Sequence, residues 1–201
     1  MSHYYKYDPT LKSNKKDISY TFKGEVVHLV SDSGVFSKER VDFGTNVLLN
    51  SLSDELLDKS KTILDVGCGY GAIGVCIAKK YPNKNVLMID INDRCVELVL
   101  ENINNNKLNN AKALKSNVYQ NIVGEFDLII SNPPIRAGKD VVFEVVSGAK
   151  PHLTQGGALI VVIQKKQGAP SLEKKMQEVY GNCDIVSKEK GYYILKSERK
   201  E

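Results

Sequence analysis

The sequence predicts an α/β fold in which a mostly parallel, seven-stranded sheet carries helices on both faces. From Lys61 onward, short aliphatic or β-branched runs alternate with amphipathic stretches, which is the pattern of repeated βαβ units. The first of these runs leads directly into a glycine-dense turn at 67–74 and then into a helix. The last two runs flank Lys190 and Gly191, which predicts an antiparallel hairpin at one edge of the sheet.

The segment before this region is expected to add a small N-terminal unit. Residues 1–18 are polar and lysine-rich, which predicts a flexible arm. Two β-like runs around Lys23 and Gly24 predict a hairpin, and apolar residues at helical spacing from Val47 to Leu57 predict one amphipathic helix. A single domain is therefore expected over 19–201, with the hairpin and helix in 19–60 beside a cofactor-binding core in 61–201.

The elements of this core can be placed from the positions of the apolar runs. The predicted strands are 62–66, 85–90, 111–116, 126–131 and 157–163, and the predicted helices are 71–80, 93–105, 140–152 and 170–180. Asn92 or Asp93 is expected to cap the second of these helices and Asp140 the third, because Asn and Asp side chains accept hydrogen bonds from the first N–H groups of a helix. The connection 119–125 is too short for more than one helical turn.

Composition and charge narrow the classes of protein. The 201 residues are 42% hydrophobic and 26% charged, which suits one domain with a full core. A net charge of +4 is compatible with a polyanionic partner without requiring one. The four cysteines form no close pair and have no histidine at zinc-site spacing, so we expect free thiols, no metal and a cytoplasmic location. The apolar runs are strand-sized, and no membrane association is expected.

The glycine-dense turn predicts a nucleotide-like ligand. Its glycines let the backbone come close to a ligand at the carboxyl end of a strand, and Asp90 ends the next strand, where a carboxylate can accept hydrogen bonds from ribose hydroxyls. Gly69, Gly71 and Gly74 also fit the dinucleotide fingerprint, so a nicotinamide dehydrogenase is one alternative. Asp65, just before the turn, would attract the positively charged amino acid end of S-adenosylmethionine and repel a pyrophosphate, which favours the sulfonium cofactor.

The tetrapeptide Asn132, Pro133, Pro134 and Ile135, at the end of the fourth strand, indicates the chemistry. An aromatic exocyclic amine is a poor nucleophile because its lone pair is delocalised into the ring. The Asn132 side-chain oxygen and the Pro133 carbonyl can accept hydrogen bonds from such an NH₂ group and leave its lone pair directed at a methyl donor. Consecutive prolines fix φ and lack the N–H groups that would satisfy these acceptors. Ile135 can pack on the base, which we expect to be unstacked into this pocket.

The turn resembles the acidic-x-Gly-x-Gly-x-Gly motif of class I methyltransferases, which Asp65, Gly67, Gly69 and Gly71 match. The resemblance implies that Asp65 and the turn hold the methionine moiety of S-adenosylmethionine, that Asp90 holds the ribose and that Asn117 contacts the adenine. The further cofactor contacts expected on this basis are Cys68, Ile91, Val118 and Asn132.

A narrower resemblance covers about residues 20–197. The strings at 33–37, 41–45, 132–138 and 167–171, in this order, resemble those of bacterial 16S ribosomal RNA guanine-N2 methyltransferases. The resemblance implies the Rossmann-like class I methyltransferase fold, S-adenosylmethionine as cofactor, and ribosomal RNA or the 30S subunit as partner. Phe36 and Ser37 would border the cofactor, with Gly44 and Thr45 close by. Longer family members carry an extra N-terminal methyltransferase-like domain, and a single-domain form is expected here.

Basic residues that follow or flank the predicted strand ends are candidates for RNA contact, because they can neutralise phosphates. They are Arg40, Arg136, Lys139, Lys165 and Lys166. His28 and His152 are expected to be structural.

Two further alternatives are an N-methyltransferase acting on adenine N6 or a protein glutamine amide, which also use Asn-Pro-Pro, and a non-catalytic RNA-binding scaffold with the same fold. The adenine N6 and glutamine methyltransferases carry an aromatic residue after Asn-Pro-Pro. Because this chain has Ile135 there, and because of the family resemblance, guanine is favoured.

Overall fold

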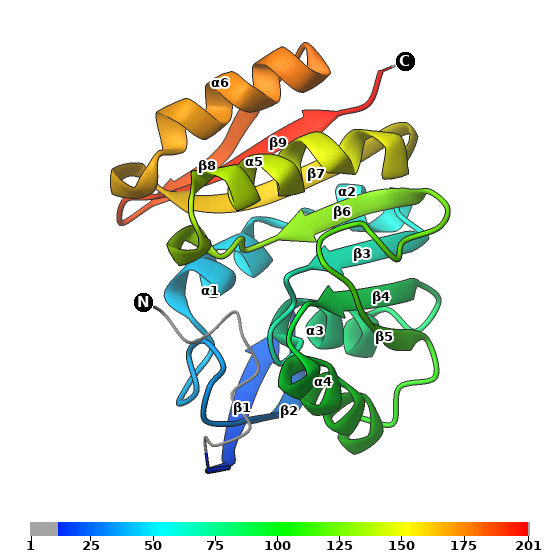
Figure 1. Ribbon diagram of the computed structural model, residues 1–201. Helices are drawn as coiled ribbons and strands as arrows, with labels where there is room; N and C mark the ends of the chain where they lie inside the picture. Colours follow the sequence, from blue (N-terminus) through cyan, green and yellow to red (C-terminus); the bar gives the residue numbers. More distant parts are fainter. Residues whose placement is uncertain (1–11, 201) are drawn as a thin grey trace.

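The computed structural model describes residues 12–200, and the seven-stranded, mostly parallel sheet expected from the sequence is confirmed (Figure 1). In spatial order the strands are β5 (Ala111–Lys115), β4 (Asn85–Asp90), β3 (Thr62–Val66), β6 (Phe126–Ser131), β7 (Leu153–Gln164), β9 (Tyr192–Glu198) and β8 (Asp184–Glu189). Six strands run in the same direction, and β9 runs antiparallel to both of its neighbours, β7 and β8. The chain order reverses between β3 and β6, and open α/β sheets bind ligands at such a switch point.

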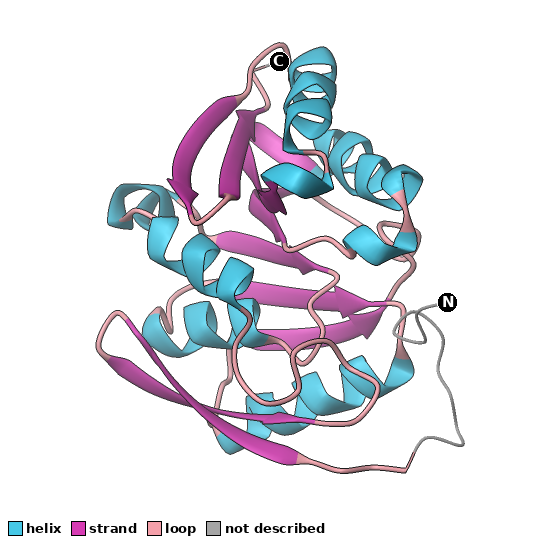
Figure 2. Cartoon of the chain, turned by 90° about the vertical axis from the view of Figure 1, so that its left-hand side faces the viewer, coloured by secondary structure: helices cyan, strands magenta, loops and turns pink. Residues whose placement is uncertain are grey.

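Helices cover both faces of the sheet (Figure 2). One face packs against α1 (Phe43–Ser51), α2 (Asp54–Lys59), α3 (Ala72–Lys80) and α4 (Asp93–Asn105). The other packs against α5 (Lys139–Ala149) and α6 (Ala169–Tyr180). Alternate residues of each central strand therefore enter two separate hydrophobic cores, as Ile63 and Leu64 of β3 show.

Three sequence predictions about element boundaries were wrong. The helix expected across Val47 to Leu57 is divided into α1 and α2, because Leu52 is extended and the Ser53 hydroxyl caps α2 by accepting a hydrogen bond from the Leu56 N–H. Asp140 lies in the first turn of α5, whose capping position is taken by Gly138 without a side-chain hydrogen bond. Strand β7 begins at Leu153, earlier than predicted, and its pairing with β6 has a register shift.

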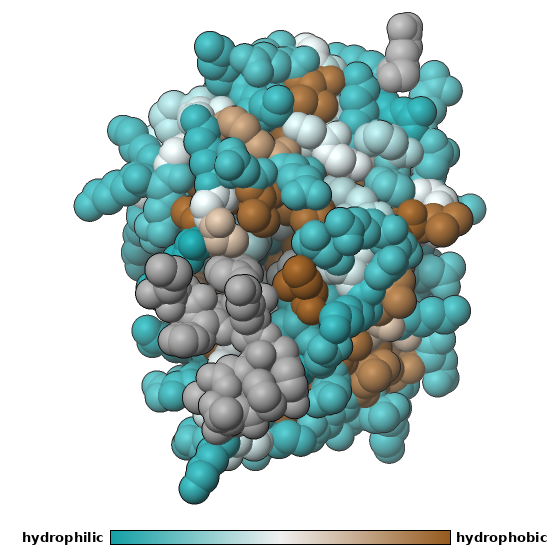
Figure 3. Space-filling model, viewed as in Figure 1, coloured by the Kyte–Doolittle hydropathy of each residue, from teal (hydrophilic) through white to brown (hydrophobic). Residues whose placement is uncertain are grey.

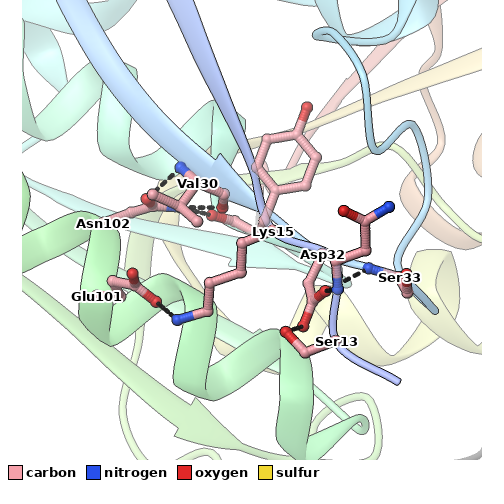
Figure 4. Close-up of polar contacts among 9 residues, drawn as sticks. Ser13, Lys15, Val30, Asp32, Ser33, Glu101 and Asn102 are labelled. Carbon is pink, nitrogen blue, oxygen red and sulfur yellow. Dashed lines mark hydrogen bonds and ion pairs between the residues drawn. The ribbon is translucent and has the colours of Figure 1, made fainter. Parts of the chain in front are cut away.

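The N-terminal hairpin forms a separate two-stranded sheet from β1 (Lys16–Phe22) and β2 (Glu25–Ser31). Its turn has positive φ at Lys23 and Gly24, as tight hairpins prefer. Most of the predicted arm at 1–18 lies outside the described residues, and its last residues belong to β1. The described residues just before β1 are held by polar contacts, including one from the Ser13 hydroxyl to Asp32 (2.8 Å) (Figure 4).

The hairpin docks on α4 through two asparagines rather than through another strand. The Asn102 side chain accepts a hydrogen bond from the Val30 N–H (2.6 Å) and donates to the Val30 carbonyl (3.0 Å) (Figure 4). Asn106 makes the same pair of bonds with the backbone of His28. Asn102 also donates to the carbonyl of Tyr70, which lies in the glycine-dense turn (2.8 Å). The hairpin edge and the turn are therefore tied to one buried side chain.

The surface carries scattered hydrophobic residues. On the face drawn in Figure 3 they form small separate patches among hydrophilic residues. None of the helices in the described part of the chain is both long and apolar enough to cross a membrane. Cys68, Cys76, Cys95 and Cys183 are free thiols.

Candidate active site

A cavity of about 470 Å³ opens at the carboxyl ends of β3, β4, β5 and β6, beside the switch point. Its volume falls within the range of small-molecule sites. The sequence-predicted residues that line it come from segments far apart in the chain. They are Phe36, Ser37, Thr45, Gly67, Cys68, Gly69, Asp90, Ile91, Asn117, Val118, Asn132, Pro133, Pro134, Ile135 and Arg136.

The glycine-dense turn forms one wall and is held by the end of β4. The N–H groups of Gly67 and Cys68 both donate to the Ile89 carbonyl (2.9 and 3.0 Å), and the Gly69 N–H donates to the Asp90 carboxylate (2.9 Å). Gly67 and Gly69 have φ of 68° and 58°, which L side chains rarely adopt. A Cβ atom on Gly69 would meet nothing within 4 Å, so this backbone is open to a ligand.

Asp90 stands at the cavity edge with its carboxylate fixed from two sides. One oxygen accepts the Gly69 N–H and the other accepts the Asn92 N–H (2.9 Å each). Burial raises the pKa of this carboxyl above its ordinary value, although these hydrogen bonds oppose the shift. Ile91, directly after it, is 40% exposed and offers an apolar surface to the same cavity.

Asp65 does not line the cavity, although the sequence predicted that it would meet the cofactor. It is 1% exposed and lies beneath the turn, because its position in β3 directs the side chain toward α3. One oxygen accepts the Gly74 N–H (3.0 Å), while Oδ1 has no hydrogen-bond partner among the described residues. Burial, with a smaller contribution from the charge of Asp90, raises the pKa of Asp65 to about 7. Gly71, also predicted as a contact, instead precedes the first turn of α3.

The tetrapeptide after β6 forms the opposite wall. The Asn132 side-chain nitrogen donates to the Asp42 carboxylate (3.1 Å) and to the Thr45 hydroxyl (2.9 Å). Asp42 and Thr45 also line the cavity, and with its nitrogen engaged by both of them, Asn132 has its amide oxygen left as an acceptor. The Pro134 carbonyl accepts the Ala137 N–H (2.9 Å), which closes a short 3₁₀ turn. Two prolines and this turn fix the wall in place.

Several cavity residues were not predicted from the sequence. Asp42, from the start of α1, contacts Asn132, and Gln164, Gln167 and Tyr192 line the end of the cavity nearest β7 and β9. Tyr192 reaches this place because α1 carries Gly44, where a Cβ atom would come within 2.8 Å of the tyrosine ring. Asp42 and Gln167 belong to strings that carry the family resemblance, but nothing in the sequence assigned them to the cavity, because the pairing of distant segments brings these residues together.

Arg136 is the one predicted RNA-contacting residue that lines the cavity. Lys165 and Lys166 follow directly after β7, and Lys139 begins α5, where its ammonium lies 4.9 Å from the centre of the Phe143 ring. Arg40 lies near the glycine-dense turn, because its carbonyl accepts the Tyr70 hydroxyl (3.4 Å). These side chains are exposed, and none takes part in the ion pairs formed among residues 12–200. Arg136 is part of the cavity wall, and the other four lie beside segments that contribute to it.

Comparisons with known proteins show which family the chain resembles. The family model described as methyltransferase small domain matches residues 26–196. The uncharacterized protein YbxB of Bacillus subtilis is 43% identical over 98% of both chains. Ribosomal RNA small subunit methyltransferase C of Haemophilus influenzae is 38% identical over 85% of this chain and 52% of the relative.

A solved structure gives a similar result. A 16S rRNA N2 methyltransferase from T. thermophilus, in complex with AdoMet and guanosine, superposes with a TM-score of 0.83 and 27% identity. The match covers 95% of this chain and 52% of that one. The chain thus spans about half the length of the ribosomal RNA methyltransferases that it matches.

Proposed function

The chain belongs to the methyltransferase small domain family, and from this premise we propose that it transfers a methyl group from S-adenosylmethionine to the exocyclic N2 amine of a guanosine in 16S ribosomal RNA. The observation that carries the proposal is the orientation of Asn132. Its nitrogen is bound by Asp42 and Thr45, so its oxygen is available to accept a hydrogen bond from an NH₂ group. The T. thermophilus structure, solved with guanosine, supports the choice of base.

The residues of the cavity fit S-adenosylmethionine. The open backbone at Gly69 lets a ligand lie against the turn, and the fixed carboxylate of Asp90 suits ribose hydroxyls. Asn117 and Val118 would border the adenine, and Phe36 would cover it from the loop before α1. A cationic ligand close to the turn would stabilise the ionised form of Asp65, whereas a pyrophosphate would oppose it.

When bound, S-adenosylmethionine supplies an electrophilic methyl group on a sulfonium that leaves as a thioether. The protein's part is to prepare the amine. Asn132 Oδ1 and the Pro133 carbonyl accept hydrogen bonds from the NH₂ group, which keeps its lone pair directed toward the methyl donor. Because neither acceptor is a strong base, the proton leaves the nitrogen to water once the new N–C bond forms.

The distribution of charge supports an RNA partner. The basic side chains around the cavity have no acidic partner, whereas the ion pairs of the described region use other lysines and Arg199. Unpaired cations are available to neutralise phosphates. We therefore assign Arg40, Arg136, Lys139, Lys165 and Lys166 to contacts with the ribosomal RNA, either naked or in the 30S subunit.

The direct test uses the full chain with tritium-labelled S-adenosylmethionine and either 30S particles or purified 16S rRNA. After digestion, the expected labelled nucleoside is N2-methylguanosine. Label in N6-methyladenosine, or label in protein and none in RNA, would show that the substrate assignment is wrong.

Two variants test the roles in the site. Asn132→Ala should lower turnover by about 100- to 1000-fold, the typical cost of removing one preorganised hydrogen-bonding group, while calorimetry shows cofactor affinity close to that of the wild type. Asp90→Ala should instead weaken cofactor binding, by about 10- to 100-fold for the loss of charged hydrogen bonds. If Asn132→Ala transferred methyl at the original rate, the mechanism would be refuted.

A further inference from the structure

We propose that Asp42 and Thr45 are positioning residues that set which end of the Asn132 amide faces the cavity. This inference rests on the proposed function, because the reaction needs an acceptor at that place. A side-chain amide can turn by half a rotation and present either its oxygen or its NH₂ group at nearly the same position. Only the first orientation can bind the hydrogens of an amine substrate.

The carboxylate of Asp42 decides between these orientations. It carries no proton to donate, and its Oδ2 lies 3.1 Å from the Asn132 nitrogen. In the rotated amide, the Asn132 oxygen would face this carboxylate oxygen, and two acceptors without a hydrogen between them repel each other. The Thr45 hydroxyl, 2.9 Å from the same nitrogen, provides a second acceptor.

The position of Asp42 is in turn set by α1. Its Oδ2 also accepts the Thr45 N–H (3.2 Å), which makes Asp42 the N-cap of the helix. Thr45 is 7% exposed, and α1 is fixed on the sheet by its buried Val47, Leu48 and Leu49. The orientation of Asn132 therefore depends on a helix that precedes the whole βαβ core in the chain.

This arrangement determines which methyl acceptors the site can bind. With its oxygen facing the cavity, Asn132 binds groups that carry N–H bonds and gives no hydrogen bond to a carbonyl or carboxylate. The N-terminal unit thus selects amines as methyl acceptors, in addition to covering one face of the sheet.

The test compares variants that separate the contact of residue 42 with Asn132 from its role as the N-cap of α1. Asp42→Ser keeps a residue that caps helices well but is too short to reach Asn132, whereas Asp42→Asn keeps an oxygen of the right reach. Thr45→Val keeps the shape and removes the hydroxyl. Ser53→Ala, which removes the equivalent cap of α2, controls for lost helix stability alone.

We expect Asp42→Ser to lower kcat by about 10- to 100-fold, with KM for RNA and the cofactor Kd close to wild type. Thr45→Val should have a smaller effect in the same direction, and Asp42→Asn should recover most of the rate lost in Asp42→Ser. Ser53→Ala should lower the melting temperature and leave kcat unchanged. Equal kcat in Asp42→Ser and wild type would overturn the proposal, as would Asp42→Asn being as slow as Asp42→Ser.

A second measurement is independent of the reaction. In ¹⁵N-labelled protein the Asn132 side-chain NH₂ signals, assigned by their absence in Asn132→Ala, should be protected from hydrogen exchange. They should lose protection in Asp42→Ser and keep it in Asp42→Asn. If the wild type methylated no RNA but showed this pattern, the proposed function would fail while the positioning role stood. Unchanged protection in Asp42→Ser would refute the positioning role itself.

Discussion

Asp65 is a buried carboxylate with one satisfied oxygen and one unpartnered oxygen, and burial raises its pKa to about 7. In the unfolded chain the same group would ionise near pH 4. Between these values the folded protein holds a proton that the unfolded chain has released. Its contribution to the free energy of unfolding is therefore complete below about pH 4 and is lost as the pH rises through about 7.

Asp65→Asn should remove this dependence, because an amide does not titrate. We expect the difference in free energy of unfolding between the variant and the wild type to increase, in favour of the variant, by a few kcal/mol as the pH rises from about 5 to about 8. Urea denaturation of the ligand-free protein across this range measures the difference. Parallel stability curves for the two proteins would mean that Asp65 titrates at its ordinary pKa.

At the scale of residues, the sequence predicted many of the residues that line the cavity, but not the direction in which each side chain points. The turn, Asp90 and the tetrapeptide could be placed because strand ends of a parallel sheet share one edge. The sequence position of Asp65 suggested a ligand contact, yet the strand points it beneath the turn. The contact of Asp42 with Asn132 joins residues 90 positions apart, and no local pattern reports it.

At the scale of elements, Gly74 lets α3 lie close to β4. A Cβ atom at this position would come within 2.4 and 2.5 Å of Cγ and Sδ of Met88, which is fully buried. These atoms lie in the middle of a packed side chain, so little room remains for adjustment. The glycine that fits a dinucleotide fingerprint in the sequence therefore has a packing role in the structure.

Gly74→Ala should lower the free energy of unfolding by about 1–3 kcal/mol through overpacking, even though alanine favours helices. Met88→Ala should cost about 2–5 kcal/mol by leaving a cavity. The double variant should be more stable than the sum of the two effects predicts, by about 1 kcal/mol or more, because the new methyl group enters the space that Met88 leaves. Strict additivity in denaturant titrations would contradict this account of the packing.

The element boundaries that the sequence did not predict have local causes. Helical periodicity continues across Leu52 and Ser53, but the Ser53 hydroxyl starts a new helix by binding the Leu56 N–H. Periodicity reports which face is apolar and not whether the backbone is continuous. Similarly, Asp140 has the chemistry of a cap, but the chain enters α5 through Gly138 with φ of 108°.

At the scale of the whole molecule, Arg40, Arg136, Lys139, Lys165 and Lys166 are a group of basic residues near the cavity that form no ion pair within residues 12–200. Lys190, at the tip of the last hairpin, joins them, since the carbonyl of the adjacent Gly191 accepts the Lys165 N–H (2.8 Å). By contrast, Lys59 is paired with Glu55 and lies at the end of α2, before β3 begins and therefore near the opposite edge of the sheet.

Replacing Lys165 and Lys166 together by alanine should weaken binding to 16S rRNA and make it less sensitive to salt. The slope of log affinity against log salt should fall by about one for each phosphate that the variant no longer neutralises, while cofactor affinity stays unchanged. Filter binding at several salt concentrations measures the slope. Replacing Lys59 and the exposed Lys61 together by alanine is the charge-matched control, and an equal loss of affinity in that variant would show that only net charge matters.

The global fold was the most predictable property of the chain. Alternating apolar runs determine a parallel sheet, and the hairpin around Lys190 and Gly191 sets its antiparallel strand. The docking of the N-terminal hairpin was not predictable, because it depends on Asn102 of α4 and on Asn106, the residue that caps the end of this helix, and both look in the sequence like ordinary polar residues.

Asn102 engages both ends of its amide, with the oxygen accepting from Val30 and the nitrogen donating to the carbonyls of Val30 and Tyr70. Aspartate would offer no hydrogens, leucine would offer no polar atom, and glutamine would be one methylene too long. None of these replacements is therefore equivalent at a point where the hairpin and the ligand-binding turn meet. In random mutagenesis, Asn102 should be among the positions that tolerate the fewest substitutions, although it lies outside the cavity.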